Sequence, residues 1–331
     1  MSREKRLEYS REVEHFLLRN PAESPLHATL SQGIRSDIEA VELEPTGART
    51  ILALSAPFTT GKSTTVKAMA RALYREWMGS ASLADRPRWA PPMTEDVEAD
   101  RIPVIYLNLQ SDTSSKDLYA QILTYLGHAT ASTRGQLAMR VPKACRLHGV
   151  RLLILDDAHM LRTHLRQGRA TLDAIKAIAT ELGEIGGMLL LVGAWAGDSD
   201  LLDDPQIRGR LSLSELNVYA IRTNADKSLW QKLLKSWESA LEPYLPDTPR
   251  SALSRDYARY LYERTQGYVG DLAKCLARAT ATAIADGRCQ LEAEDLVAAR
   301  LSQRARDHEG SSDSVAHRPE SKRASRSRDV G

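Results

Sequence analysis

The stretch SAPFTTGKSTT, residues 55–65, decides the fold because of what lies on either side of it. Before it, Thr50 to Leu54 (TILAL) is a short, apolar, β-prone run, typical of a strand that is buried on both faces. After it come residues that favour a helix. A strand, a glycine-containing loop and a helix in this order are the context of a Walker A motif, so the stretch predicts a phosphate-binding loop.

Two side chains of this loop are expected to act directly on the phosphates of ATP. Lys62 should reach the β and γ phosphates, and the Ser63 hydroxyl should bind Mg²⁺. Backbone N–H groups at the start of the following helix should surround the phosphates, where the helix dipole also favours an anion. The other residues expected to contact the nucleotide are Ala56, Pro57, Thr59, Thr60, Gly61 and Thr64.

Ala56 departs from the pattern G-x-x-x-x-G-K-[ST], which has glycine at that position. The extra methyl group is tolerable where the backbone stays in a region open to L-residues, although it could weaken nucleotide affinity. The alternative is a chance Gly-Lys-Ser at the start of a helix. The strand before the loop favours the phosphate-binding interpretation.

A second motif, LLILDD at residues 152–157, ends a predicted buried strand in two carboxylates. Asp156 is expected to hold Mg²⁺, and Asp157 to orient the attacking water. Many ATPases have Glu at the second position, and the shorter Asp157 predicts slow hydrolysis. An acidic pair after a strand can also be a helix cap, but Lys62 and Ser63 favour a catalytic role.

The composition excludes several classes of protein. The 331 residues contain 45 Lys and Arg against 43 Asp and Glu, so the net charge of +2 indicates no particular partner. With 42% hydrophobic and 27% charged residues, a globular chain is expected. No window approaches the roughly 18 apolar residues of a membrane helix, and the charged start does not suit a signal peptide. Three cysteines without a C-x-x-C pair indicate neither disulfides nor zinc, so we expect a cytoplasmic protein without membrane contact.

Strands alternate with helices through the middle of the chain, which predicts βαβ crossovers and a parallel sheet with helices on both faces. The expected strands are 50–54, 104–109, 150–155, 188–192 and 211–218, and the intervening helices are 63–77, 115–126, 135–148 and 171–182. After Asn224 only helices are expected, at 227–241, 254–264, 269–285 and 292–300.

This pattern predicts four parts. They are an N-terminal helical arm (1–48, with helices at 3–19 and 26–43), an α/β nucleotide-binding domain (49–223), a small α-helical lid domain (224–303) and a disordered tail (304–331). A polar stretch between Gly79 and Arg101 is expected to be an inserted surface loop.

Taken together, these segments resemble an AAA+ ATPase, and more narrowly the TniB/TnsC-like ATPases of DNA transposition. The matching stretches are SAPFTTGKSTT (55–65), VIYLNLQSDTSSKDLYAQILTYLG (104–127), LLILDDAHML (152–161), LLLVGAWAGDSDLLDDPQIRGRL (189–211) and TQGYVGDLAKCLARATATAIADGRCQLEAEDL (265–296). The resemblance covers roughly residues 26–300 and implies a P-loop NTPase with ATP and Mg²⁺ as cofactors.

The resemblance also implies an arginine finger before the last strand, where this chain offers Arg208 and Arg210, and Arg210 fits the spacing better. Such an arginine reaches the ATP of a neighbouring copy, which implies a homo-oligomer, either a ring or a helical filament. Both arginines could instead solvate a surface turn. Two sensor positions depart from the family pattern: Gly193-Ala194-Trp195 offers no hydroxyl or amide, and Gly270-Asp271-Leu272-Ala273 has Lys274 one place late. These departures favour a slow switch over a fast motor.

By the same resemblance, double-stranded DNA is an expected partner, together with a transposase and a target-selection protein. The first candidate DNA-binding loop is 111–116, with Thr113, Ser114 and Lys116. The second is a basic run of Arg162, His164, Arg166 and Arg169, for which a solvated loop is an equal alternative.

The sequence therefore predicts an ATP-dependent DNA-binding regulator that assembles on duplex DNA and recruits or activates a transposase. A helicase loader of the same clade is one alternative. A nucleotide-dependent assembly protein with little hydrolysis is another, and a small-molecule kinase fits least because the C-terminal helices resemble an AAA+ lid.

Overall fold

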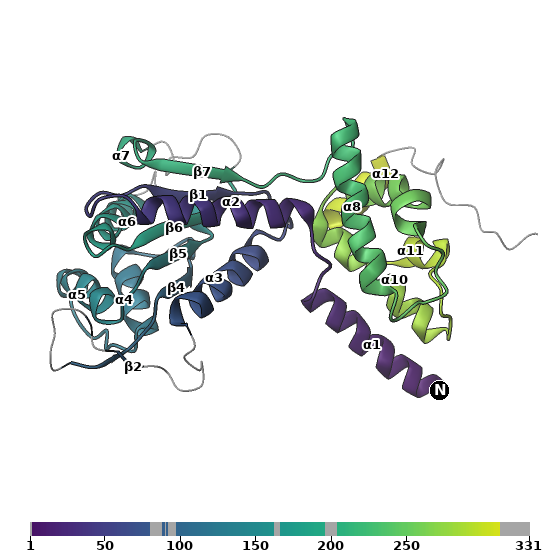
Figure 1. The fold of residues 1–331 in the computed structure, drawn as a ribbon, viewed down its shortest axis with the longest axis horizontal. Coiled ribbons are helices and arrows are strands. Elements are labelled where there is room, and N and C mark those ends of the chain that lie inside the picture. Colours follow the sequence, from purple (N-terminus) through teal and green to yellow (C-terminus); the bar gives the residue numbers. More distant parts are fainter. Residues whose placement is uncertain are drawn as a thin grey trace, which may run out of the picture. The chain divides into compact units, whose positions relative to one another are not determined.

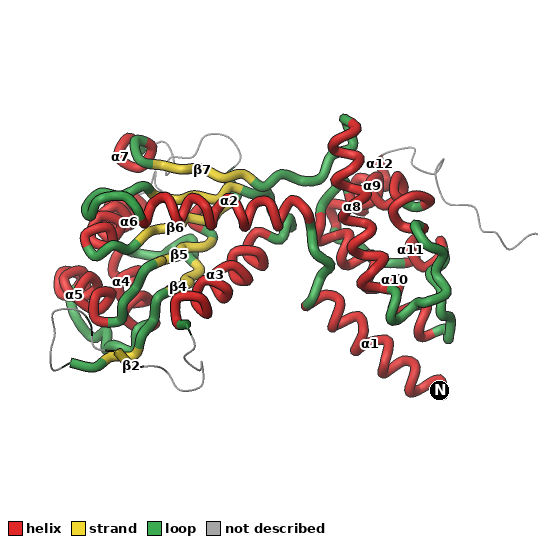
Figure 2. The backbone as a smooth tube through the Cα atoms, in the orientation of Figure 1, coloured by secondary structure: helices red, strands yellow, loops and turns green. Residues whose placement is uncertain are grey.

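The computed structural model describes residues 2–79, 88–89, 91, 97–161, 166–195 and 204–311. Its contacts divide the chain into two compact units. The helical unit contains Met1–Ala28, Thr59–Gly61 and Asn217–Gly331, and the sheet unit contains Thr29–Phe58 and Lys62–Leu216. Figure 2 shows strands in the sheet unit and helices with loops in the other. None of the described helices is long and apolar enough to cross a membrane.

A five-stranded parallel sheet forms the centre of the sheet unit (Figure 1). The strands are β1 (Ile51–Ser55), β4 (Val104–Asn108), β5 (Leu152–Asp156), β6 (Met188–Gly193) and β7 (Leu211–Glu215), in the order β4-β5-β6-β1-β7. The predicted parallel α/β fold is confirmed, and every predicted strand begins within two residues of its observed start. The last strand ends at Glu215, three residues earlier than expected.

Helices cover both faces of this sheet. The sheet unit contains helix α2 (Pro25–Glu42) from Thr29 onward, because its first four residues belong to the helical unit. It also contains α3 (Lys62–Met78), α4 (Ser115–Tyr125), α5 (Arg134–Leu147), α6 (Arg166–Glu184) and the short α7 (Pro205–Arg208). Alternate strand residues such as Ile105 and Leu153 share one buried cluster with α4, α5 and α6. The residues of opposite parity face the other side, where α3 lies against β4. The sheet is therefore buried on both faces, which explains why its strands are almost entirely apolar.

The helical unit contains α1 (Arg3–Arg19), α8 (Asn224–Leu241), a π-helical turn (Ala252–Asp256), α9 (Ala258–Thr265), α10 (Val269–Ala285), α11 (Ala293–Ala298) and α12 (Gln303–Ser311). Its core centres on Trp230 and Trp237 of α8, which are at most 2% exposed, together with the apolar face of α10. The predicted helix at 254–264 is split, because its first turns are π-helical and α9 starts only at Ala258.

The N-terminal arm and the tail differ from the predicted division. Helix α1 packs on α10 through the buried Val13 and Leu17, so residues 1–28 belong to the helical unit and no boundary falls at 48. Residues 303–311 form α12, where Ala305 is fully buried. The expected disordered tail therefore starts at least eight residues too early, and residues 312–331 lie outside the described part of the chain.

The stretch between Gly79 and Arg101 contains paired backbone where a loop was expected. Strand β2 (Arg88–Trp89) pairs with β3 (Ala99–Asp100) in an antiparallel ribbon. The two pairs join Arg88 with Asp100 and Trp89 with Ala99.

Candidate nucleotide-binding site

The loop after β1 contains two residues with a left-handed backbone. Thr59 and Gly61 both have positive φ, at 61° and 85°, a conformation that occurs in backbone turns that bind anions. Ala56 has an ordinary φ, and its N–H donates to the Gly193 carbonyl at 3.0 Å. The backbone at Ala56 therefore tolerates the methyl group, as the sequence predicted.

His27 contacts the middle of this loop from outside. Its Nε2 lies 2.6 Å from the Thr60 carbonyl oxygen, so Nε2 carries the proton and donates it. Nδ1 then accepts from Ser24 Oγ at 2.6 Å, and Ser24 Oγ lies 2.7 Å from the Tyr219 hydroxyl. Burial lowers the pKa of His27, opposed by the hydrogen bond to Thr60. Sequence reasoning missed this contact because no local pattern links residues so far apart.

One Walker B carboxylate, that of Asp157, lies beside the P-loop lysine. Lys62 Nζ is 3.6 Å from Asp157 Oδ1, and Lys62 is only 8% exposed. The Phe58 ring covers Lys62, with Nζ 5.4 Å from the ring centroid. The arrangement holds a nearly buried cation against one carboxylate, which is a suitable place for a polyphosphate.

Asp157 has an unusual backbone conformation, and His159, two residues later, has an unusual side-chain environment. Asp157 has φ 56° and ψ 30°, a left-handed conformation that Asp and Asn tolerate better than other L-residues. His159 Nδ1 lies 3.9 Å from Asp157 Oδ1, and its ring meets the Phe58 ring edge-on at 5.3 Å. Neither buried ring nitrogen of His159 has a hydrogen-bond partner among the described residues. Burial lowers its pKa, although Asp157 opposes that shift.

Tyr106 of β4 joins the two residues that were expected to bind Mg²⁺. Its hydroxyl donates a hydrogen bond to Asp156 Oδ2, and the Ser63 side chain also hydrogen-bonds to Tyr106. Asp156 is fully buried, and its Oδ1 accepts from the Asp157 N–H at 2.8 Å. Burial, and next the bond to Asp156, raise the pKa of Tyr106. Sequence reasoning missed Tyr106 because it looks like an ordinary apolar strand residue.

These groups fit Mg²⁺, which prefers hard oxygen ligands and keeps few protein contacts when it binds with phosphates. Ser63 supplies a hydroxyl and Asp156 a carboxylate held in place by Tyr106. The described residues contain no cluster of three or more His, Cys, Asp or Glu that could hold a metal without help.

The two candidate finger arginines lie at the other end of the sheet. The Ile51 N–H, at the start of β1, donates to the Arg210 carbonyl, whereas the P-loop follows the end of β1. A five-residue strand spans about 17 Å, so Arg210 cannot reach the Lys62 side of its own sheet. Its side chain is half-buried and lies 3.5 Å from Thr180 Oγ1, and burial lowers its pKa. Arg208 ends α7 and is exposed.

In the first candidate DNA-binding loop, the side chains of Thr113 and Ser114 already form local hydrogen bonds. Thr113 is 5% exposed, and its hydroxyl accepts from the Gln110 N–H at 2.9 Å, so its contact with DNA stays a prediction that this burial does not favour. Ser114 caps α4 and donates to Asp117 Oδ2 at 2.5 Å, whereas Lys116 is exposed. Of the second candidate, Arg166 and Arg169 are exposed on α6, and Arg162 and His164 lie outside the described residues.

Glycines at the two sensor positions have steric reasons, whereas the second departure itself lies at Ala273. A side chain at Gly193 would come within 2.8 Å of the Trp195 ring, so the tryptophan takes the space of a polar residue there. A side chain at Gly270 would come within 2.8 Å of the Thr59 carbonyl, which accepts from the Gly270 N–H at 3.2 Å. The buried Asp271 bonds to Arg304 and to Ser302 Oγ, so it holds the start of α12.

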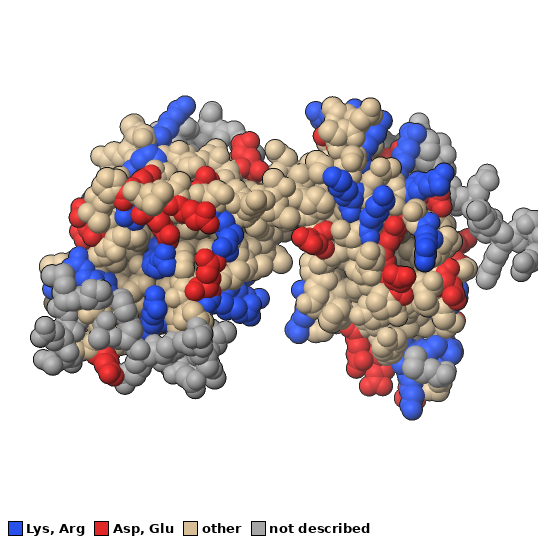
Figure 3. All heavy atoms as spheres, in the orientation of Figure 1, with Lys and Arg blue, Asp and Glu red and all other residues tan. Residues whose placement is uncertain are grey.

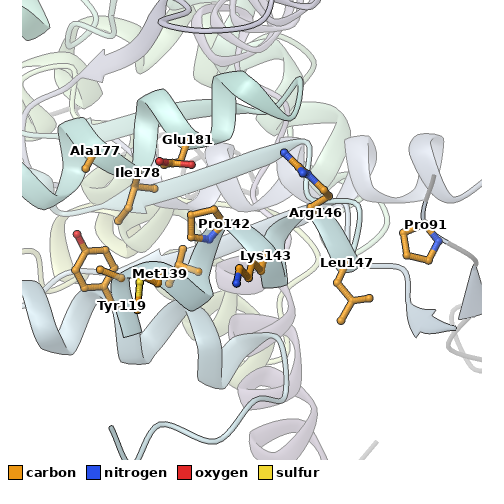
Figure 4. A pocket seen from close by; sticks show the side chains of 12 residues that line it. Pro91, Tyr119, Met139, Pro142, Lys143, Arg146, Leu147, Ala177, Ile178 and Glu181 are labelled. Carbon is orange, nitrogen blue, oxygen red and sulfur yellow. The ribbon is translucent and has the colours of Figure 1, made fainter. Parts of the chain in front are cut away.

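A separate cavity of about 830 Å³ lies on α4, α5 and α6 and has no residue of the P-loop or Walker B strand in its lining. Figure 4 shows Lys143 and Arg146 of α5 at this cavity, with Glu181 across it on α6. On the faces visible in Figure 3, basic and acidic residues are interspersed, in agreement with the small net charge.

Comparison with known proteins found a family model that matches part of the chain. Residues 75–221 match the family model described as bacterial TniB protein. Over this segment the chain is TniB-like. The match begins after the P-loop and includes Asp156, Asp157 and Arg210. No curated protein matches the chain.

The chain is also similar to three solved structures, each at 16% identity. The Aeropyrum pernix ORC2 protein in ADPNP and ADP complexes has a TM-score of 0.58, with 89% of this chain and 72% of that chain covered. Cdc6p from Pyrobaculum aerophilum has 0.53, with 84% and 68%. Drosophila ORC bound to DNA has 0.54, with 94% and 67%. At this identity the likeness shows the fold, which is an AAA+ P-loop fold followed by a helical region.

Proposed function

We propose that this chain is an ATP-dependent DNA-binding AAA+ ATPase that regulates transposition. In this proposal it assembles on duplex DNA and recruits or activates a transposase at the target site. The observation that carries the proposal is the convergence of Lys62, Asp156 and Asp157 at the ends of β1 and β5, inside a chain with a TniB-like segment.

The geometry supports a division of labour among the site residues. A bound triphosphate competes with Asp157 for the Lys62 ammonium, which frees the Asp157 carboxylate to orient water. Ser63 and Asp156 would hold Mg²⁺, which neutralises charge on the β and γ phosphates. Tyr106 holds the Asp156 carboxylate in place.

Arg210 supports the assembly part of the proposal. Because it lies at the opposite end of the sheet from Lys62, it is expected to complete the site of a second copy. Hydrolysis then requires contact between copies. ATP binding between copies also makes assembly depend on nucleotide.

The similarity to ORC and Cdc6 structures favours one alternative, a helicase loader of the same clade. Helicase recruitment to DNA with purified partners separates the two functions. A transposition regulator should retain a transposase on target DNA and leave the helicase unbound.

The test of the ATPase part is steady-state ATP turnover with and without duplex DNA, for the wild type and Lys62→Ala. Slow turnover that rises with DNA and disappears in Lys62→Ala supports the proposal. Turnover that persists in Lys62→Ala would place hydrolysis elsewhere or in a contaminant.

A further inference from the structure

A cavity of about 480 Å³ opens between α3 and the edge strand β4 of the sheet unit. Its lining is basic and aromatic, with six residues that matter here: Lys67, Arg71, Tyr74, Arg75, Tyr106 and Tyr125. None of its described lining residues is acidic. We call it the α3 cavity.

The three cations form a stripe along α3. Lys67, Arg71 and Arg75 are four residues apart, so they share one face and follow each other at about one helical turn. Like charges at this spacing destabilise a helix. Elsewhere on α3 a charge is paired, since Arg35 bonds to Glu76 at 2.6 Å. Within the described part of the chain, no carboxylate forms an ion pair with any cation of the stripe, so a bound anion would relieve the repulsion.

The tyrosines add flat apolar surface beside the stripe. Tyr125 is 45% exposed, Tyr74 is half-buried, and Lys67 Nζ lies 5.1 Å from the centroid of the Tyr106 ring. Rows of cations with aromatic faces are typical of surfaces that follow a nucleic-acid strand, where the cations bind phosphates and the rings stack on bases. A single small anion would use only part of this row.

We infer that the α3 cavity binds consecutive phosphates of a polynucleotide strand through Arg71 and Arg75. The inference rests on the proposed function and adds a DNA contact outside the loops expected from sequence.

The α3 cavity adjoins the nucleotide site through one side chain. The Tyr106 ring lines the cavity, while the Tyr106 hydroxyl bonds to Asp156 and Ser63. A strand in the cavity and a nucleotide at Ser63 therefore act on the same residue. By linkage, any effect of nucleotide on strand affinity must be matched by an equal effect of the strand on nucleotide affinity.

The test compares the double variant Arg71→Gln/Arg75→Gln with Lys143→Gln/Arg146→Gln, which removes the same charge from exposed positions of α5. The full chain is mixed with a slowly hydrolysed ATP analogue. Fluorescence anisotropy of a labelled duplex and of a labelled single strand then gives the affinity over a range of salt concentrations. Inorganic phosphate and a free deoxynucleoside monophosphate serve as competitors, and melting temperature and DNA-free ATP turnover confirm that both variants fold.

We expect Arg71→Gln/Arg75→Gln to weaken strand binding at least about tenfold and to reduce the slope of log affinity against log salt by about two, one for each lost phosphate contact. The α5 variant should stay within about twofold of wild type, as should DNA-free turnover in both. A loss of affinity for the single strand only, or for both the single strand and the duplex, supports the inference and identifies the form of DNA that is bound.

Unchanged DNA affinity and salt slope in Arg71→Gln/Arg75→Gln would overturn the inference, and so would an equal loss of affinity in the α5 variant. In either case DNA binding by the wild type leaves the proposed function standing. Competition by inorganic phosphate or the monophosphate at the concentration of strand phosphates would also overturn it, because the cavity would then be a small-anion site. A wild type that binds no DNA with nucleotide contradicts the proposed function and this inference together.

Discussion

His27 Nε2 lies 2.6 Å from the Thr60 carbonyl oxygen, and this contact fixes the direction of the Gly61 amide. The carbonyl of Thr60 and the N–H of Gly61 belong to one planar trans peptide, so they point in opposite directions. Anchoring the carbonyl on His27 therefore turns the N–H away from His27. The phosphate-binding shape of the loop depends in part on a histidine that precedes it by 33 residues.

Two isosteric variants test this relationship. The amide of His27→Gln can still donate to Thr60, whereas that of His27→Asn reaches only as far as Nδ1 and loses the contact. We expect His27→Asn to weaken binding of a fluorescent ADP analogue about tenfold, the value of one hydrogen bond of about 1.4 kcal/mol. His27→Gln should stay within about threefold. Equal affinities in the two variants would contradict the role of the Thr60 contact.

The lowered pKa of His27 makes stability depend on pH. Its pKa is below the ordinary value of about 6.5 in the folded chain, so the unfolded chain takes up the proton first as pH falls. The contribution is fully present above about pH 6.5 and is lost below it. The melting temperature of the wild type should therefore fall more steeply from pH 7 to 5.5 than that of His27→Gln. Parallel curves would show that His27 titrates alike in both states.

Asp157 provides a test of why hydrolysis is expected to be slow. Asp157→Glu lengthens the side chain by one methylene and should raise ATP turnover. The backbone at position 157 is left-handed and suits Glu less well than Asp, so the same substitution should cost about 1 kcal/mol of stability. Asp157→Asn tolerates the same backbone, so it should lose turnover without the backbone cost of Asp157→Glu. If Asp157→Glu is no faster than wild type, the length of the side chain is not the cause.

The positions of the strands and of the Walker residues could be predicted from sequence because each has a local signal. Buried parallel strands are continuous apolar runs, and a lysine after a glycine loop and a carboxylate after a strand both lie at the carboxyl ends of their strands. Such ends meet at one edge of the sheet. The closeness of this lysine and this carboxylate could therefore be predicted without knowledge of how the helices pack on the sheet.

The supporting contacts had no such signal. Tyr106 reaches Asp156 only because β4 pairs with β5 in one register, and His27 reaches Thr60 across a long stretch of chain. Thr113 looked like a surface hydroxyl, yet its loop uses that hydroxyl internally. Arg304 looked like part of a charged tail, although its guanidinium bonds to the buried Asp271 and stacks on Tyr268. Tertiary partners decided the roles of Tyr106, His27 and Arg304, whereas the partner of Thr113 is three residues away in its own loop.

The Arg304 contact predicts a stability effect far from the nucleotide site. Arg304→Ala leaves the fully buried Asp271 carboxylate without its cation, which should cost about 3 kcal/mol in the free energy of unfolding. Arg306→Ala, two residues on and exposed, is the matched control and should change it by less than about 0.5 kcal/mol. Urea denaturation measures both, and similar midpoints in the two variants would show that α12 does not stabilise the helical unit.

Arg210 predicts a result that only an oligomer can give. Arg210→Ala should abolish turnover, and so should Lys62→Ala, but their mixture should regain part of it, because an intact Arg210 can then meet an intact Lys62 across an interface. Arg208→Ala under the same conditions shows which arginine acts. If the mixture stays inactive while wild type hydrolyses ATP, Arg210 does not act between copies.

The most direct test of ATP-dependent assembly on DNA is imaging by negative-stain electron microscopy. Wild type and Lys62→Ala are mixed with duplex DNA and a slowly hydrolysed ATP analogue, and the wild type is also imaged without nucleotide. Rings or filaments on DNA should form only with wild type and nucleotide together. Particles that stay monomeric, or assemblies that form equally well without nucleotide or with Lys62→Ala, would contradict the proposed function.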